Sequence, residues 1–158
     1  MLKAIQSKTF QAGEARFAIV ASEYNARYVD AMLRAAKAEL KRAGAKSVQV
    51  IRVPGAYEIP VVAARLARGT AQPAPAAIIC LGVILRGETT HAAHIGEAVS
   101  QALMQIQLQH EVPVIHEVLL LENQQQAEVR CLGREHNRGA EAAQTALAMA
   151  GIMKGLGR

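Results

Sequence analysis

Aromatic residues, cysteines and long apolar runs are all scarce in this sequence of 158 residues. There is no tryptophan, and aromatic residues make up only 3% of the chain. The two cysteines, Cys80 and Cys131, form neither a C-x-x-C pair nor a disulfide framework. No apolar run reaches the roughly 18 residues that a membrane span needs, and the first residues lack the apolar core of a secretory signal. We therefore expect a cytoplasmic protein without a membrane-spanning segment.

The sequence also lacks any long run of basic residues, although its formal net charge is +5 and its pI is about 9.6. Lysines and arginines are scattered, and few aromatic side chains are present on which bases could stack. A nucleic-acid partner is therefore disfavoured. The positive charge instead favours an anionic small molecule as ligand.

Aliphatic residues are abundant, and hydrophobic residues make up 51% of the chain. A core of alanine, valine, isoleucine and leucine suits closely packed helices and strands. The length suits one compact domain over residues 1–158, with residues 1–15 as an N-terminal extension.

Short apolar runs alternate with longer segments of helical periodicity. The expected strands are Arg16–Ser22, Ser47–Val53, Ala76–Ile84 and Val112–Leu121. The expected helices are Asn25–Leu40, Ile59–Ala67, His91–Gln109, Glu122–Cys131 and Asn137–Leu156. This alternation predicts an α/β fold, a three-layer flavodoxin-like sandwich in which helices flank a four-stranded parallel sheet.

Ligands of such sheets gather at the carboxyl ends of the strands. Four polar segments fall at or near these ends: Tyr24–Asn25, Gly55–Glu58, Leu85–His91 and His116–Glu117. We expect these segments to share one crevice.

The stretch "LRGETTHAAH" joins the third strand to the following helix. Gly87 permits a tight turn, and Thr89 or Thr90 can cap the helix. The free N–H groups and the positive end of the helix dipole make this an anion site. Alone, the stretch is more typical of an ordinary capped helix than of a ligand site, and it is not a P-loop.

His91 lies in the first turn of that helix, where an imidazole can exchange protons near neutral pH. His94 follows three residues later on the same face. The spacing is not H-E-x-x-H and no third ligand is obvious, so we predict no metal site. A lone histidine in such a place is often only structural.

Other charged and aromatic side chains have two interpretations each. Arg130 and Arg138 suit phosphate recognition or are surface charges, and Glu141 could pair with either. Tyr24 could stack on a flat ring or pack in the core. Glu58 could bind hydroxyls or begin a helix.

Five motifs together resemble the 6,7-dimethyl-8-ribityllumazine synthase family, from about Phe17 to Met149. They are "IVASEYN", "VPGAYEIP", "GVILRGETTH", "VPVIHEVLLLEN", and "QAEVR" followed by "HNRGAEAA". The resemblance implies a transferase that condenses 5-amino-6-ribitylaminouracil with 3,4-dihydroxy-2-butanone 4-phosphate, without metal or organic cofactor. The product, 6,7-dimethyl-8-ribityllumazine, belongs to riboflavin biosynthesis, and phosphate and water are released.

The resemblance also implies which residues bind the ribitylaminouracil. Tyr24 would stack on the pyrimidine, and His116 stands where the family has a phenylalanine that caps the ring. The other implied residues hold the ribityl chain and ring edge or line the ring through backbone atoms: Ala56, Tyr57, Glu58, Val83, Ile84 and Leu85.

For the second substrate, the resemblance implies phosphate binding by the amide groups of Glu88 and Thr89 and by the Arg130 side chain. Arg138 stands where the family usually has lysine, and Glu141 would orient Arg130. His91 would be the proton-transfer residue.

Family members form pentamers with active sites between subunits, so His116 and Arg130 would come from the neighbour of the chain that supplies Tyr24 and His91. The segment between Arg130 and Asn137 has no insertion, which favours an icosahedral shell of sixty subunits over a free pentamer or decamer. Riboflavin synthase is the protein partner that the resemblance implies.

Several positions depart from the family pattern. Ala92 and Ala93 replace an aromatic and an acidic residue after the histidine, and Glu117 replaces glycine. A divergent paralogue that binds lumazine or flavin, or forms a shell with little turnover, is therefore an alternative hypothesis. A flavodoxin-like nucleotide or phosphate binder is a third.

Overall fold

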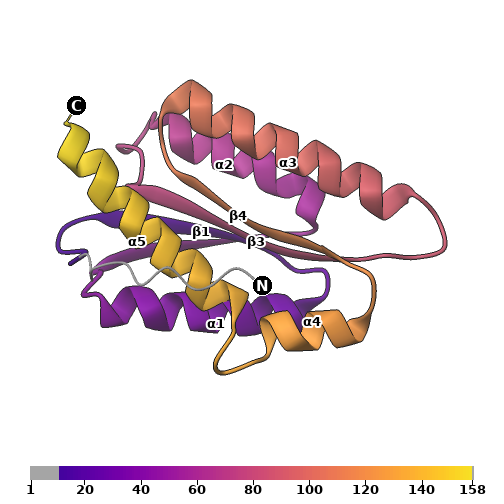
Figure 1. Ribbon diagram of the computed structural model, residues 1–158. Helices are drawn as coiled ribbons and strands as arrows, with labels where there is room; N and C mark the ends of the chain where they lie inside the picture. Colours follow the sequence, from indigo (N-terminus) through magenta and orange to yellow (C-terminus); the bar gives the residue numbers. More distant parts are fainter. Residues whose placement is uncertain (1–10, 158) are drawn as a thin grey trace.

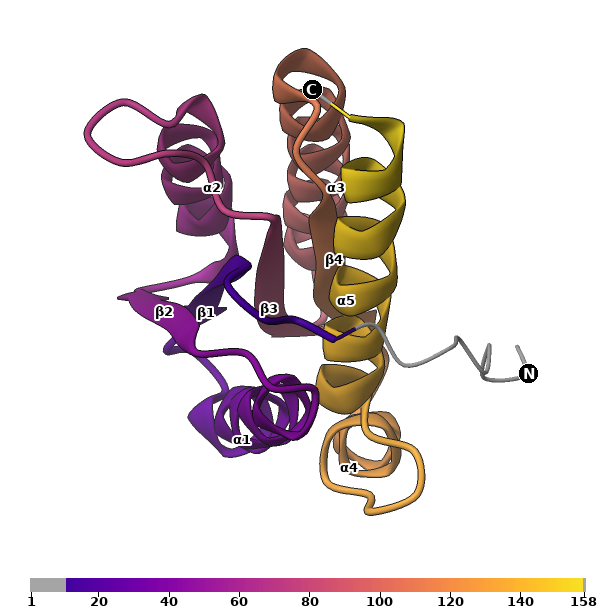
Figure 2. The same ribbon diagram turned by 90° about the vertical axis from the view of Figure 1, so that its left-hand side faces the viewer.

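The computed structural model describes residues 11–157 and contains one four-stranded parallel sheet (Figure 1). The strands lie in the order β2-β1-β3-β4, which the edge-on view of Figure 2 displays from left to right. Their bounds are β1 (Arg16–Ser22), β2 (Ser47–Val53), β3 (Ala77–Leu85) and β4 (Val114–Leu121). All neighbouring strands pair in parallel, as the sequence predicted.

Helices cover both faces of this sheet. Figure 1 shows α2 and α3 on one face, and α1, α4 and α5 on the other. The helical elements are α1 (Ala26–Arg42), the 3-10 turn η1 (Ala56–Glu58), α2 (Ile59–Arg68), α3 (His91–His110), α4 (Gln124–Cys131) and α5 (Arg138–Leu156). The predicted three-layer α/β class is therefore confirmed, with element ends within a few residues of those expected.

The expected N-terminal extension falls largely outside the described residues, because residues 1–10 are not among them. Its last residues belong to the fold. The backbone N–H of Ala12 donates to the Ala43 carbonyl at 3.0 Å, and the Ala12 side chain is buried.

The two central strands are buried on both faces, which explains their nearly continuous apolar sequences. Every residue of β1 after Arg16 is buried, and so are the first seven residues of β3. The edge strand β2 instead alternates between exposed and half-buried residues over most of its length. Two separate hydrophobic cores result, one between the sheet and α1 and α5, the other between the sheet and α2 and α3.

Close contact between α1 and α5 depends on a glycine. A Cβ atom added to Gly139 would lie 2.0 Å from the backbone oxygen of Met32, so no other residue fits without moving a helix. Alanines continue this face of α5, and Ala142, Ala143 and Ala146 are buried. The tight contact fixes the first turn of α5, which carries Arg138 and Glu141.

The strand order places a topological switch between β1 and β3. The chain leaves β1 towards α1 on one face, and it leaves β3 towards α3 on the other. The connections that follow these paired strands therefore run to opposite faces of the sheet, which opens a crevice where ligands bind in open α/β sheets.

Candidate active site

A pocket of about 710 Å³ lies at this switch, between the carboxyl ends of β1 and β3, the β2–α2 connection and the first turns of α3. Its lining residues are Tyr24, Asn25, Gly55, Ala56, Tyr57, Glu58, Val83, Ile84, Leu85, His91, His94, Ile95 and Ala98. Three of the four strand-end segments expected to share a crevice therefore contribute to it. Apart from His116, every residue implied for the ribitylaminouracil lines this pocket, together with His91.

Asn25 joins the two strands that form the back of the pocket. Its side-chain Nδ2 donates to the Val83 backbone oxygen at 2.7 Å, and its backbone adopts the left-handed conformation with φ 57°. Asparagine tolerates this conformation better than most residues other than glycine. Tyr24, just before it, also lines the pocket and is 73% exposed.

The β2–α2 connection forms the second wall. Glu58 Oε2 accepts a hydrogen bond from the backbone N–H of Gly55 at 3.0 Å, which holds the carboxylate against the turn. A Cβ atom on Gly55 would lie 2.9 Å from that oxygen and 3.3 Å from the Tyr24 ring. The glycine is thus required for the turn, the carboxylate and the aromatic ring to meet at one place.

The third wall is one face of α3. His91, His94, Ile95 and Ala98 fall at spacings of three, four and seven residues, which places them along one side of a helix. The sequence predicted a role for His91 and placed His94 on the same helix face, but it did not identify His94, Ile95 or Ala98 as lining residues. The helical spacing from His91 was the signal that could have found them.

Residues 86–90, between β3 and α3, are not among the lining residues of the pocket, and the first turn of α3 is sparsely capped. Thr90 at the N-cap makes no side-chain capping hydrogen bond, while Thr89 Oγ1 accepts weakly from the His91 N–H at 3.4 Å. A Cβ atom at Gly87 would meet no described atom within 4 Å. Glu88 and Thr89 are exposed beside this open space and are not among the described lining residues.

The remaining predicted site residues lie elsewhere. Among residues 11–157, the pocket lining includes none of His116, Arg130, Arg138 and Glu141. Arg130 belongs to α4, on the opposite face of the sheet from α2 and α3 (Figure 1). Within one chain, these four residues therefore lie outside the lining of the pocket that contains Tyr24 and His91.

A compact group of charges forms where β4, α4 and α5 meet. Arg138 pairs with Glu141 at 3.0 Å, whereas no ion pair of Arg130 occurs within the part of the chain that the structure describes. Burial raises the pKa of Glu117 to about 7; Arg138 opposes this shift and Glu141 adds to it. The carboxyl of Glu117 therefore titrates near neutral pH beside the two arginine-bearing helices.

His116 lies on β4 and faces α3. One ring nitrogen lies 2.7 Å from Ser100 Oγ, and Nδ1 accepts from the Val118 N–H at 3.1 Å. The latter bond means that the neutral ring carries its proton on Nε2, which donates to Ser100. Burial lowers the pKa of His116, which favours this neutral form.

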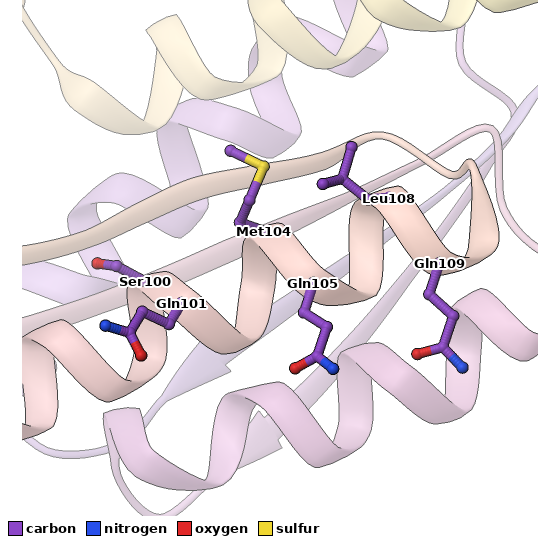
Figure 3. Close-up of a pocket in the computed structure, with 6 residues that line it drawn as sticks. All are labelled: Ser100, Gln101, Met104, Gln105, Leu108 and Gln109. Atoms are coloured by element: carbon purple, nitrogen blue, oxygen red, sulfur yellow. The ribbon is translucent and has the colours of Figure 1, made fainter.

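A second, open groove of about 860 Å³ runs along the outer side of α3 (Figure 3). In the figure, Gln101, Gln105 and Gln109 project in a row, and Met104 and Leu108 project to another side of the helix. Met104 is 54% exposed and Leu108 is 70% exposed. Because they are four residues apart in the helix, these two side chains form a short exposed apolar strip on α3.

Among residues 11–157, no three His, Cys, Asp or Glu side chains are grouped so as to hold a metal ion. In the same residues, no helix is long and apolar enough to cross a membrane.

Comparison with known proteins gives a consistent result. Residues 14–154 match the family model described as 6,7-dimethyl-8-ribityllumazine synthase. The chain is 43% identical over 144 residues to the 6,7-dimethyl-8-ribityllumazine synthase of Stenotrophomonas maltophilia (strain R551-3), covering 90% of this chain and 91% of that protein. It is 42% identical over 142 residues to the protein of the same name from Xanthomonas campestris pv. campestris (strain B100), covering 89% and 90% respectively.

Proposed function

Because the chain belongs to the 6,7-dimethyl-8-ribityllumazine synthase family, we propose that its pocket at the β1–β3 switch is the condensation site of that reaction. The chain is a transferase of riboflavin biosynthesis. It condenses 5-amino-6-ribitylaminouracil with 3,4-dihydroxy-2-butanone 4-phosphate and releases 6,7-dimethyl-8-ribityllumazine, phosphate and water. One observation carries the assignment of the site: His91 shares one pocket with the exposed ring of Tyr24 and the end of β3.

The pyrimidine ring lies between the Tyr24 ring and the end of β3. Tyr24 supplies a flat, exposed surface for stacking, and Val83, Ile84 and Leu85 supply backbone groups at the ring edge. Glu58, held by the Gly55 N–H, presents a carboxylate acceptor to hydroxyl groups, with Ala56 and Tyr57 beside it. Stacking and edge contacts together orient the amino groups that react.

The phosphate of the second substrate lies at the start of α3. The N–H groups in the first turn of a helix and the positive end of its dipole attract an anion, and no side chain caps this helix at Thr90. The backbone amides of Glu88 and Thr89 contribute, with the Glu88 carboxylate turned towards solvent. Arg130 and Arg138 of the adjacent subunit complete the phosphate site.

His91 moves the protons of the reaction. The substrate amine attacks the carbonyl carbon, a C–N bond forms, and the carbonyl oxygen leaves as water. Cleavage of the C–O bond to phosphate follows, and the second nitrogen then closes the ring with loss of water. An imidazole beside the reacting carbonyl accepts a proton from nitrogen and returns it to the departing oxygen. Holding both substrates in one pocket supplies much of the acceleration.

An oligomer completes the site. His116, Arg130, Arg138 and the ion-pairing Glu141 come from a neighbouring chain, since within one chain they lie away from the pocket. The homopentamer is the proposed unit, and the apolar side chains of Met104 and Leu108 on the outer groove of α3 support association. Closure of pentamers into an icosahedral shell is the further proposal, and mass measurement in solution tests it.

Three broader proposals accompany this function. Residues 1–158 form a single domain, which the one sheet with its two cores and the family match over residues 14–154 support. The cytoplasm is the proposed compartment, in keeping with the free thiols of Cys80 and Cys131. Riboflavin synthase is the proposed protein partner, because the family catalyses the penultimate step of the pathway.

A turnover assay tests the proposal. Purified protein receives both substrates, and the lumazine chromophore and released phosphate are measured against the uncatalysed reaction. We expect equal amounts of both products at a rate far above that of the uncatalysed control. Tight lumazine binding without turnover would instead support a divergent binding protein, and a preference for nucleotides would support a generic phosphate binder.

A further inference from the structure

The pocket contains a second histidine, His94, in addition to His91. Both line the pocket on one face of α3, about 4.5 Å apart along the helix axis at 1.5 Å per residue. His91 is the first residue of α3, beside the proposed phosphate site, and His94 lies one turn further along. The two imidazoles therefore face different parts of any ligand that extends along the helix.

The side chain of His94 is available to a ligand. It is exposed in the pocket, and its ring makes no hydrogen bond to the part of the chain that the structure describes. His116, the other imidazole near α3, is by contrast bonded to Ser100 Oγ and to the Val118 N–H. His94 thus has a free donor and a free acceptor where His116 has neither.

The residues of η1, which form the pocket wall opposite α3, indicate which kind of ligand group lies near His94. The turn η1 packs against α3, and Tyr57 and Glu58 of η1 line the pocket with His94. A ligand segment between these elements meets a carboxylate acceptor on one side and an imidazole on the other. A neutral imidazole both donates and accepts a hydrogen bond, as a hydroxyl group does.

We propose that His94 binds the polyhydroxyl chain of the ribityl substrate and helps to select ligands that carry this chain. The proposal rests on the proposed function, because that function supplies the ribityl group. Position along α3 separates the two histidines: His91 begins the helix, where the phosphate is proposed to lie, and His94 lies three residues further along in the pocket that Tyr57 and Glu58 also line. Ile95 and Ala98, which line the same face, offer no polar group to the chain.

Binding of two lumazines tests this inference. The reaction product, 6,7-dimethyl-8-ribityllumazine, carries the ribityl chain, whereas 6,7,8-trimethyllumazine has a methyl group in its place. Lumazine fluorescence reports the dissociation constant of each ligand for the full-length wild type, His94→Ala and His94→Gln. His110→Ala is the matched control, because it removes a histidine from the far end of the same helix.

We expect His94→Ala to weaken binding of the ribityl ligand about tenfold, the effect of one lost hydrogen-bonding group, and to leave trimethyllumazine binding unchanged. His94→Gln should recover part of the loss, since its amide donates and accepts. In the turnover assay, kcat/KM for the ribitylaminouracil should fall about tenfold, and a rise in KM should account for this fall. His110→Ala should match the wild type.

Other outcomes overturn the inference in distinguishable ways. Equal weakening of both ligands would mean that His94 supports the pocket without recognising the chain. A fall in kcat with a shifted pH profile and unchanged product binding would make His94 a proton-transfer residue. A wild type that binds neither lumazine would contradict the proposed function itself, whereas a normal wild type with an unaffected His94→Ala variant would overturn only this inference.

Discussion

The side-chain amide of Asn25 donates a 2.7 Å hydrogen bond to the backbone carbonyl of Val83. This bond joins the end of β1 to the end of β3 at the point where the chain leaves the two strands towards opposite faces of the sheet. Because Val83 lines the pocket, the bond also fixes the wall against which the pyrimidine ring is proposed to lie. Asn25, itself a lining residue, thus holds the ends of β1 and β3 together at the site.

Replacing Asn25 with alanine or glycine separates the hydrogen bond from the backbone conformation. Both variants lose the bond to Val83, at a cost of about 1 kcal/mol in the free energy of unfolding. Alanine must also adopt the left-handed conformation, which costs roughly a further 1 kcal/mol that glycine avoids. Denaturant unfolding at fixed protein concentration should therefore rank the wild type above Asn25→Gly, and Asn25→Gly above Asn25→Ala. Equal stability of all three would show that neither effect operates.

Two glycines on α5 make a matched pair for testing the α1–α5 contact. Gly139→Ala places a Cβ atom against the Met32 backbone and should cost about 3 kcal/mol, because neither helix can yield without losing buried contacts. Gly155→Ala meets nothing within 4 Å of its Cβ position among the described residues and should be neutral or stabilising by up to about 1 kcal/mol. Thermal unfolding of the two variants measures the difference. Similar melting temperatures would contradict the close contact at Gly139.

The fold was largely predictable from the sequence because its signals are local. The apolar runs of β1 and β3 reflect burial on both faces, and the glycines and polar residues between elements mark the turns. Helical periodicity places His94 and Ala98 on the same face of α3 as His91, but it does not show that this face lines a pocket. His94 and Ala98 are exposed, and exposed positions carry no apolar signal that separates a pocket wall from an ordinary surface.

The site was only partly predictable for a different reason. The motifs name His116, Arg130 and Arg138, but no spacing in one chain tells whether these residues meet Tyr24 in the same subunit or in another. The structure separates them from the pocket of their own chain. Nor does the sequence reveal the environment of Glu117, because its altered pKa depends on burial and on Arg138 and Glu141 around it.

Glu117 should make the stability of the protein depend on pH. The folded protein keeps the carboxyl protonated up to about pH 7, whereas the unfolded chain releases that proton near the ordinary value of 4.5. Between these values the folded state binds more protons, so stability falls as pH rises, and the loss is complete above pH 7. Glu117→Gln has no carboxyl to ionise and should lose this dependence.

The comparison of Glu117→Gln with the wild type is made at two pH values. At pH 4.5 the two proteins should be similarly stable, and at pH 8 the variant should be more stable by on the order of 1 kcal/mol, since Glu117 is partly exposed. Melting temperatures across this range measure the difference. A constant offset at all pH values would indicate a packing effect and exclude titration of Glu117 as its cause.

Arg130 should matter chiefly for the phosphorylated substrate. Arg130→Ala removes a guanidinium group from the proposed phosphate site and should lower kcat/KM for 3,4-dihydroxy-2-butanone 4-phosphate by about 10- to 100-fold. Arg65→Ala removes the same charge from the exposed side of α2 and controls for net charge. Steady-state kinetics with each substrate varied in turn distinguish the Arg130→Ala variant from the Arg65→Ala control. Identical constants for Arg130→Ala and the wild type would exclude Arg130 from the phosphate site.

Mixing two impaired variants tests whether neighbouring chains share each site. His91→Ala removes the proton-transfer group from the pocket, and Arg130→Ala removes the phosphate ligand proposed to come from the neighbour. When both chains are co-expressed, a site is intact where an Arg130→Ala chain supplies His91 and the adjacent His91→Ala chain supplies Arg130. Random assembly of equal amounts gives such a site at about a quarter of the interfaces, so about a quarter of the wild-type activity should return.

If both residues acted within one chain, no mixture would contain an intact site, and activity would stay at the level of the separate variants. Mixing the purified variants without exchange of subunits provides the baseline for this measurement.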